Sequence, residues 1–297
     1  MTTSSGKKEN ISGRRQVKIR LATQLAAAAL LNGYIAGFAK GQIFTGKTKK
    51  ICVPVLNCYS CPGALGSCPV GALQTILSRR HARFPFYVLG TLMLFGIVFG
   101  RLLCGFICPF GLLQDLLYKI PVRKLSVKAR IDRPARYIKY AVLLILCILL
   151  PLFATTSRPF FCEYICPAGT LEGGIPLLIK HPQLRALAGH LFTWKALLLL
   201  IFLIGSMLIS RFFCRYFCPL GAFYALFNRF SIYQMRIDRD ACSGCSACAG
   251  ICPMDVTVES PECIRCGKCR AVCPKGAVSS GFELVNTGEN AAKGVRR

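Results

Sequence analysis

The sequence predicts an α-helical polytopic membrane protein with about four transmembrane helices in two parallel repeats, and a small α+β domain at the C-terminus. Three observations lead to this fold class. Of the 297 residues, 54% are apolar and only 17% are charged, which is typical of membrane proteins and not of soluble domains. The motif Cys-Pro-x-Gly occurs four times, in three cases just after a long apolar run. From about residue 237 the chain becomes polar and dense in cysteine.

The charge and the cysteine content argue against two other classes of protein. The net charge is +26, but Lys and Arg flank the apolar runs and form no stripe with interleaved aromatic residues, so the sequence does not favour nucleic-acid binding. The 19 cysteines are not typical of a secreted disulfide scaffold, because many lie in tight two-residue spacings and the chain has long apolar runs. Such spacings favour metal binding.

The membrane domain is expected at residues 21–236, after a basic cytoplasmic tail at residues 1–20. Its apolar runs lie at 21–39, 84–100, 140–157 and 196–210. The first is about one membrane helix long, and the fourth is short unless the segment from about residue 186 to 194 extends it. Pro151 inside the third run predicts a kink. Residues 237–282 form the predicted C-terminal domain, and residues 283–297 are expected to be a disordered tail.

The distribution of basic residues predicts the orientation in the membrane. Lys and Arg are more frequent in segments 1–20, 101–139 and 211–297 than in segments 39–83 and 155–195. Because the more basic side of a membrane protein is the cytoplasmic one, we expect a multi-pass protein of the cell membrane with both termini in the cytoplasm. The loops that carry cysteines 58–68 and 162–166 would then lie outside.

The four Cys-Pro-x-Gly copies begin at Cys68, Cys108, Cys166 and Cys218. Proline after the cysteine suits the first position of a helix, because its missing N–H costs no hydrogen bond there. Each copy therefore predicts a cysteine at the start of a short helix, such as 111–120 or 221–230. The dipole at a helix start favours a thiolate and the negative charge of a thiolate-ligated cluster. Three copies carry a second cysteine four residues earlier, at Cys104, Cys162 and Cys214.

The C-terminal domain carries two runs of the pattern C-x2-C-x2-C-x3-C-P. This is the ligand pattern of bacterial ferredoxins, in which three close cysteines hold one [4Fe-4S] cluster and the fourth crosses to the other cluster. On that rule one cluster takes Cys242, Cys245, Cys248 and Cys273, and the second takes Cys263, Cys266, Cys269 and Cys252. The alternative is a zinc module, since C-x2-C pairs also bind zinc.

The segments GRLLCGFICPFGLL and SRFFCRYFCPLGAF align residue by residue and follow the second and fourth apolar runs. Parallel repeats at 21–120 and 140–230 would therefore meet at a pseudo-two-fold axis and bring together the ligands of a third [4Fe-4S] cluster, namely Cys104, Cys108, Cys214 and Cys218. The alternative is that these cysteines only pack at helix ends. Arg101 and Arg211 precede the two pairs, and they either offset the charge of an anionic cluster or anchor the helices at the membrane interface.

The outer half-sites predict a fourth cluster. Its ligands would be Cys162 and Cys166 with two or more of Cys58, Cys61 and Cys68, so that five cysteines compete for four positions. A face outside the membrane also permits disulfides or redox-active thiols, and this alternative stays open. Cys147 in mid-span is expected to be a small packing residue, and Glu172 in the outer loop is expected to face solvent.

These motifs resemble a known family, the polyferredoxin-like membrane 4Fe-4S binding proteins of the NapH, NosR C-terminal half and CcoG type. The resemblance rests on the pairs Cys104/Cys108 and Cys214/Cys218 and on the double C-terminal run, and it covers the chain from about residue 20 to 280. It implies an integral membrane electron carrier with a cytoplasmic ferredoxin domain and, for some members, electron exchange with the quinone pool or a flavin-bearing partner. The outer cysteines set this sequence apart from the simpler members and favour a path across the bilayer.

We therefore expect a membrane-bound iron–sulfur electron-transfer protein, a quinol-dehydrogenase-like subunit of an oxidoreductase and not a stand-alone enzyme. Embedded in lipid, it would pass electrons between a cytoplasmic donor or the quinone pool and a partner such as a flavoprotein, a ferredoxin or an outer-face reductase. The alternatives are an assembly factor for a membrane redox enzyme and a redox sensor. A bilayer core about 30 Å thick separates the inner from the outer site unless the chain brings them inward.

Overall fold

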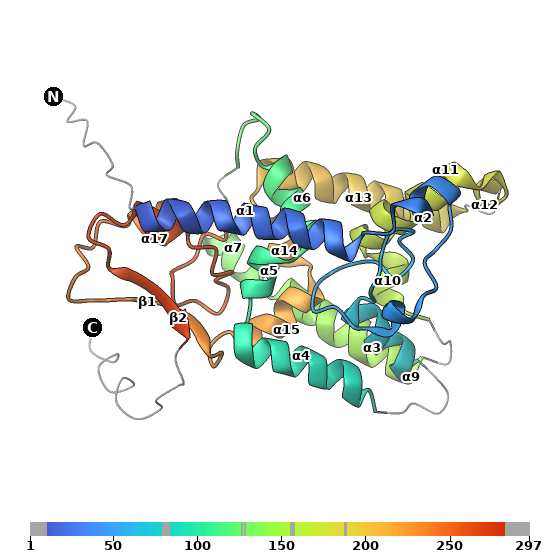
Figure 1. Ribbon diagram of the computed structural model, residues 1–297, viewed down its shortest axis with the longest axis horizontal. Coiled ribbons are helices and arrows are strands. Elements are labelled where there is room, and N and C mark those ends of the chain that lie inside the picture. Colours follow the sequence, from blue (N-terminus) through green and yellow to red (C-terminus); the bar gives the residue numbers. More distant parts are fainter. Residues whose placement is uncertain are drawn as a thin grey trace.

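The computed structural model describes residues 11–78, 84–125, 127, 129–154, 158–186 and 189–282. The molecule is elongated, with a helical body and a smaller part at one end that contains the two strands (Figure 1). The predicted tail at 283–297 lies outside the described residues, as do the first ten residues of the predicted basic tail.

Helices dominate the described chain, as expected where lipid leaves backbone groups no other hydrogen-bond partner. The first half contains α1 (Ile11–Leu31), α2 (Ile35–Lys40), the 3₁₀ turn η1 (Lys47–Lys50), α3 (Pro69–Leu77), α4 (Phe86–Phe99), α5 (Leu102–Phe106) and α6 (Pro109–Leu117). The second half contains α7 (Ala129–Ala135), α8 (Ile138–Ala141), the π-helical η2 (Val142–Leu149), α9 (Leu150–Phe153), α10 (Phe160–Tyr164), the π-helical η3 (Gly169–Gly174), α11 (Ile175–Lys180), α12 (Pro182–Ala186), α13 (His190–Leu208), α14 (Phe212–Tyr216) and α15 (Pro219–Phe227).

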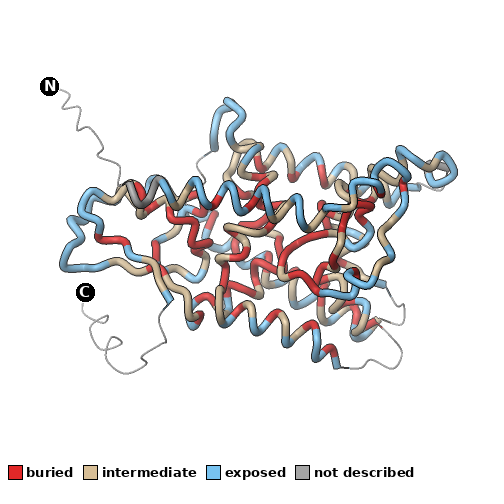
Figure 2. Tube along the Cα trace, in the orientation of Figure 1, coloured by how far each residue is buried: buried red, intermediate tan, exposed pale blue. Residues whose placement is uncertain are grey.

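Within the described chain, two helical stretches are long and apolar enough to cross a membrane, Ala129–Phe153 and His190–Leu208. Only 28% and 17% of their most apolar windows are buried, so most of their apolar surface points outward, as Figure 2 shows for the outer helices. Apolar surface on this scale is typical of a membrane-facing region. Helix α4 is equally apolar in character but shorter. These three stretches correspond to the second, third and fourth predicted apolar runs.

The first apolar run, expected at 21–39, is not one continuous helix. Helix α1 begins earlier and ends at Leu31, and α2 begins at Ile35. Between them the backbone N–H of Tyr34 donates to the carbonyl of Gly63 at 3.2 Å, which joins the chain to the outer loop. Helix α1 packs along α17 (Lys268–Val272), α5 and α6, and its buried Gln24 lies on that inward face. The helix is therefore partly a scaffold for the C-terminal domain.

Pro151 does not break the third run. The chain is π-helical over η2, directly before the proline, and α9 continues to Phe153. A widened turn removes the requirement for the hydrogen bond that proline cannot donate. The irregularity predicted at Pro151 is therefore taken up by the preceding turns.

The C-terminal domain is closed by a two-stranded antiparallel sheet. Strand β1 (Tyr233–Ile237) pairs with β2 (Val278–Phe282), with Tyr233 opposite Phe282. Met235 of β1 and Val278 of β2 are buried in a small core with cysteines of both runs. The short helices α16 (Ala247–Gly250) and α17 lie between the strands in sequence, and residues 253–262, which join the two cysteine runs, form turns and no strand.

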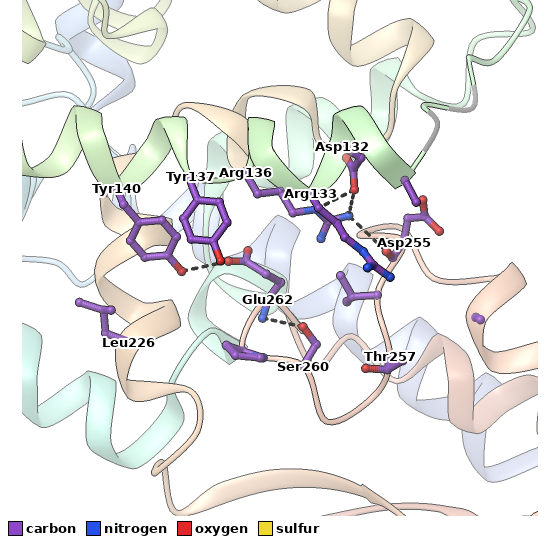
Figure 3. A pocket seen from close by; sticks show the side chains of 14 residues that line it. Asp132, Arg133, Arg136, Tyr137, Tyr140, Leu226, Asp255, Thr257, Ser260 and Glu262 are labelled. Atoms are coloured by element: carbon purple, nitrogen blue, oxygen red, sulfur yellow. Dashed lines mark hydrogen bonds and ion pairs between the residues drawn. The ribbon is translucent and has the colours of Figure 1, made fainter. Parts of the chain in front are cut away.

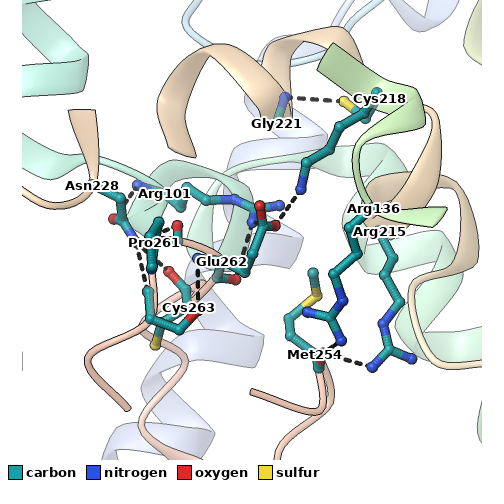
Figure 4. Close-up of polar contacts among 12 residues, drawn as sticks. Arg101, Arg136, Arg215, Cys218, Gly221, Asn228, Met254, Pro261, Glu262 and Cys263 are labelled. Carbon is teal, nitrogen blue, oxygen red and sulfur yellow. Dashed lines mark hydrogen bonds and ion pairs between the residues drawn. The ribbon is translucent and has the colours of Figure 1, made fainter. Parts of the chain in front are cut away.

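Polar contacts attach this domain to the helical body (Figure 4). The Asn228 side-chain amide at the end of α15 donates to the carbonyls of Pro261 and Cys263 at 2.8 and 3.0 Å. Arg136 and Arg215 both donate to the carbonyl of Met254, at 2.9 and 2.7 Å. Because these donors hold the backbone of the cysteine runs, the body fixes where the C-terminal cysteines lie.

Candidate metal centres

Three of the four motif cysteines stand at helix starts, as predicted. Cys68, Cys108 and Cys218 are the N-cap residues of α3, α6 and α15, each in an extended backbone conformation and followed by proline. The helices begin at Pro109 and Pro219, two residues earlier than the ranges expected from sequence. The backbone N–H of Gly221 donates to Cys218 Sγ at 3.3 Å, which shows how a helix start favours negative charge on this sulfur.

The four inner cysteines come together around one enclosed cavity. Cys104, Cys108, Cys214 and Cys218 all line it, together with Arg101 and the segment 54–56. The aligned pairs α5–α6 and α14–α15 each supply two of the four cysteines. The predicted convergence of the two repeats at this point is thus present in the structure.

The inner cavity fits an anionic cluster better than a single metal ion. In the described part of the chain, no three His, Cys, Asp or Glu side chains close around a single-ion site; a cube of four irons and four sulfides holds its thiolates farther apart than one ion does. Arg101 Nε and Nη2 are buried and have no hydrogen-bond partner among the described residues. A negatively charged group in the cavity would accept hydrogen bonds from these two N–H positions of the guanidinium.

Arg101 and Arg211 are fully buried, and each is held by a carboxylate. Arg211 donates to both oxygens of Asp115, at 2.9 and 2.7 Å, and to the carbonyl of Cys104 at 2.8 Å. Arg101 pairs with the carboxylate of Glu262 and donates to its carbonyl at 3.0 Å. Burial alone would raise the pKa of both carboxyls, but the arginines outweigh it and lower each pKa to about 2. An arginine that anchors a helix at the membrane interface extends its charged end to the lipid headgroups. The full burial of Arg101 and Arg211 differs from that position.

A second cavity gathers the outer cysteines. It is lined by Cys58, Cys68, Cys162 and Cys166, and by the basic residues Lys49 and Lys195. The motif glycines lie close to the cysteines of the opposite half, since a methyl group on Gly71 would be 3.6 Å from Cys162 Sγ and one on Gly169 would be 3.8 Å from Cys58 Sγ. The structure joins none of the described cysteines in a disulfide.

Cys61, the fifth outer cysteine, does not line this cavity. It is buried, and its Sγ lies 3.6 Å from Asn32 Oδ1 in a thiol hydrogen bond. The structure thereby separates one of the five competing cysteines from the other four. Cys147 is also fully buried, as expected of a packing residue.

Glu172 differs from its expected position in solvent. It is half-buried, and its carboxylate accepts the backbone N–H of Cys58 at 3.0 Å. Burial raises the pKa of this carboxyl to about 7. This burial could not be predicted locally, because Glu172 in η3 contacts a loop that lies more than 100 residues away in sequence.

The two cavities share one wall. Leu56 lines both of them, and it belongs to a loop segment that is largely buried, with Val55 and Asn57 almost inaccessible. The hydroxyl of Tyr224 in α15 donates to the carbonyl of Pro54 at 2.9 Å. The outer loop is therefore re-entrant, and it brings the outer cysteines next to the inner ones instead of leaving them across the full thickness of the helical body.

In the C-terminal domain, the predicted second set lies nearest the inner cavity. Cys263, Cys266 and Cys269 are buried. Cys266 packs with Met254 and Ile264 in a small core, against which Cys104 of the inner site and Cys252 also pack. The structure thus brings Cys252 of the first run to cysteines of the second run, as the crossing rule predicts.

The predicted first set lies toward the surface. Cys242 and Cys245 are exposed, and Cys248 and Cys273 are half-buried. Cys248 and Cys273 pack on the same core around Met235, which also contains Cys263 and Cys269 of the second set. This end of the domain is the more accessible of the two.

A groove separates the C-terminal domain from α7 and α8 (Figure 3). Its lining combines the aromatic side chains of Tyr137 and Tyr140, the apolar Leu226 and several charged groups. The Tyr140 hydroxyl donates to Glu262 Oε1 at 3.0 Å. Glu262, which lines the groove, directly precedes Cys263 of the second cysteine set.

Sequence reasoning missed two buried glutamines. Gln74 Nε2 lies 3.5 Å from Cys162 Sγ, and Gln114 Nε2 lies 2.9 Å from Cys214 Sγ. Both occur six residues after a motif cysteine, in Cys68-Pro-Val-Gly-Ala-Leu-Gln74 and Cys108-Pro-Phe-Gly-Leu-Leu-Gln114. An extended alignment of the four motif copies would have shown the repeated glutamine.

Comparison with known proteins identifies a family of 4Fe-4S binding proteins. A family described as "4Fe-4S binding domain" matches residues 67–87, 84–128, 139–180 and 192–237, which together make up about half of the chain. The chain is 28% identical over 252 residues to the methylamine utilization ferredoxin-type protein MauN of Paracoccus denitrificans, covering 82% of this chain and 77% of MauN.

Two further relatives are more distant or shorter matches. The ferredoxin-type protein NapH of Haemophilus influenzae is 26% identical over 62% of this chain and 60% of its own length. An uncharacterized protein of Methanocaldococcus jannaschii is 32% identical over 54% of each chain, so the match spans about half the length of that relative. No solved structure matches. The chain belongs to the family of polyferredoxin-like membrane 4Fe-4S binding proteins, which are ferredoxin-type electron carriers.

Proposed function

We propose that the protein is a membrane electron conduit that links the C-terminal ferredoxin domain to the outer loop. The observation that carries this proposal is the shared wall at Leu56, which lies between the inner and the outer cavity. Cys104 in turn packs beside Cys266 of the ferredoxin domain. The four cysteine sets therefore follow one another along the molecule, and no step has to cross a full bilayer core of about 30 Å.

In this proposal four [4Fe-4S] clusters are bound, two in the ferredoxin domain and two in the membrane domain, and when bound they supply one-electron redox chemistry. The inner ligands are Cys104, Cys108, Cys214 and Cys218, and the outer ligands are Cys58, Cys68, Cys162 and Cys166. Arg101 and Arg211 offset negative charge at the inner site, and Leu56 keeps water from the space between the two sites.

Burial of the outer thiols supports metal ligation over disulfide or thiol chemistry. Burial raises the pKa of the Cys58 thiol to about 12 and also raises the pKa of Cys162 and Cys166. Such thiols stay protonated near neutral pH and are poor nucleophiles. A metal centre would instead hold them as thiolates, with Lys49 and Lys195 nearby as counter-charges.

We assign electron exchange with a donor or with the quinone pool to the groove beside Tyr140. It offers aromatic and apolar surface next to Glu262 and Cys263, and such mixed lining suits a small redox-active ring compound. The exposed Cys242 and Cys245 give a protein partner a second approach. Both openings lie on the side that we assign to the cytoplasm, with the chain crossing the membrane several times.

Electron flux across a sealed membrane tests this function directly. The full chain with its clusters is reconstituted into liposomes that contain trapped ferricyanide, and dithionite is added outside. Bleaching of ferricyanide should be several-fold faster than in protein-free liposomes. The double variants Cys214→Ser/Cys218→Ser and Cys162→Ser/Cys166→Ser should each return the rate to the protein-free level, while the control Cys61→Ser should keep it.

Two outcomes would contradict the conduit. If the wild-type protein with its full iron content bleaches ferricyanide no faster than protein-free liposomes do, the assembly-factor or sensor function is favoured. An unchanged rate in the Cys162→Ser/Cys166→Ser variant would remove the outer site from the path.

A further inference from the structure

In three of the four motif copies, the residue six positions after the motif cysteine contacts a cysteine of the opposite half-site. In the four copies this residue is Gln74, Gln114, Glu172 and Tyr224. Glu172 accepts the backbone N–H of Cys58, and Tyr224 donates to the carbonyl of Pro54. The two glutamines alone direct a donor at a cysteine sulfur. The helix that follows each motif thus carries a second functional position beside the cysteine itself.

The orientation of the Gln114 amide is fixed by its other contacts. Gln114 is buried, and its Oε1 accepts the backbone N–H groups of Phe213 at 3.1 Å and of Cys214 at 3.4 Å. Because these donors occupy the oxygen, the NH₂ group must be the one that faces Cys214 Sγ at 2.9 Å. Its second hydrogen points to the carbonyl of Phe110, at 3.3 Å.

Gln74 repeats this arrangement at the outer site. It is fully buried, and its Oε1 accepts the backbone N–H of Phe161 at 2.9 Å. Its NH₂ group contacts the carbonyl of Val70 at 3.1 Å and Cys162 Sγ at 3.5 Å. Phe161 and Phe213 each directly precede the cysteine whose sulfur receives the amide. The same side chain therefore positions the ligand backbone and donates to the ligand sulfur in both sites.

We propose that Gln114 and Gln74 tune the reduction potentials of the inner and outer clusters by donating N–H···S hydrogen bonds to Cys214 and Cys162. This rests on the ligand sets of the proposed function. Hydrogen bonds to the ligating sulfurs are one of the factors that set the potential of such clusters. The reduced state places more negative charge on the sulfurs, so a donor stabilises it and raises the potential. The shorter contact at Gln114 predicts the larger effect at the inner site.

A redox titration followed by electron paramagnetic resonance tests this role. The signal of the inner cluster is identified as the one lost in Cys214→Ser/Cys218→Ser, and that of the outer cluster as the one lost in Cys162→Ser/Cys166→Ser. Gln114→Met, which keeps the volume and removes the donor, should shift the inner midpoint to lower potential and leave the outer one unchanged. Gln74→Met should lower only the outer midpoint, by a smaller amount.

Two further variants separate tuning from simple packing. Gln114→Glu keeps an oxygen for the Phe213 N–H, so it preserves the fold if Gln114→Met does not, and its carboxylate should lower the inner midpoint further. Ser206→Ala removes a contact on the oxygen side of Gln114 and should leave both midpoints unchanged.

The failure of the proposal can be told apart from the failure of the ligand sets. If the inner cluster of Gln114→Met or Gln114→Glu keeps the wild-type midpoint potential, the tuning role of Gln114 is overturned and the ligand sets are not. If neither cysteine double variant loses a signal, the ligand sets are overturned, and the role of the glutamines with them.

Discussion

The inner and outer cysteine sites are built from the same motif but differ in their surroundings. The inner cavity is enclosed and bordered by Arg101, which, like Arg211, is fully buried and held by a carboxylate. The outer cavity is lined by hydroxyls, the Asn57 amide and three lysines, and Glu172 lies on its Cys58 side. The difference shows that one cysteine pattern can be set in an enclosed, charge-compensated core and also in a more polar loop. The surroundings, more than the ligands, distinguish the two sites.

The largest effect should come from removing inner ligands. Cys214→Ser/Cys218→Ser should lower the iron content by about four atoms per chain, because one [4Fe-4S] cluster is lost. The cavity also joins both repeats, so we expect a lower apparent melting temperature by circular dichroism in detergent. An iron content equal to that of the wild type would show that these cysteines only pack.

Breaking an ion pair should cost much more at the inner site than at the outer face. Asp115→Asn leaves Arg211 buried without its carboxylate, which should cost about 3–5 kcal/mol of stability. The matched variant Glu163→Gln breaks a pair with Arg158, whose side chain is 58% exposed, and should cost about 0–1 kcal/mol. The stabilities of both variants are compared with wild type by denaturant unfolding in detergent. Equal losses in the two variants would remove the distinction between the sites.

The pH dependence of the inner ion pair sharpens the same contrast. The pKa of Asp115 is lowered from 3.8 to about 2, so its stabilising effect is fully present above pH 4 and is lost as the pH falls toward 2. The stability difference between wild type and Asp115→Asn should therefore shrink over this interval. The two proteins are unfolded at a series of pH values between about 6 and 2. A constant difference would contradict the assigned pairing.

The smallest effect should come from Cys61. Its weak thiol hydrogen bond to Asn32 contributes little, so Cys61→Ser should change stability by no more than about 1 kcal/mol and leave iron and sulfide unchanged. If this variant loses about four irons, Cys61 is a ligand of the outer cluster. The four outer ligands are then not the four assigned above.

Part of this arrangement could be predicted from the sequence, since it depends on local chemistry. Proline after cysteine placed Cys108 and Cys218 at helix starts, and the aligned segments around them indicated that the two repeats meet. The spacing of the C-terminal cysteines gave the ferredoxin runs. Each of these features is encoded within about a dozen neighbouring residues.

The remaining features depend on contacts between distant segments. The re-entrant loop at Leu56 has no periodicity that marks it as buried, and an isolated Gln114 in an apolar helix gives no indication of which sulfur it faces. Helix α1 begins in basic sequence because Arg20 is paired with Asp115 of α6, a partner that hydropathy does not reveal. Arg101 and Arg211 could be placed near the cysteines, but their carboxylate partners could not.

Iron and acid-labile sulfide per chain, measured on anaerobically purified protein, test the central claim most directly. The conduit predicts about sixteen irons for the wild type and about twelve for Cys162→Ser/Cys166→Ser, because the variant loses only the outer cluster. About twelve irons in both proteins would contradict it. The outer cysteines would then bind no cluster, and the path would end at the inner site.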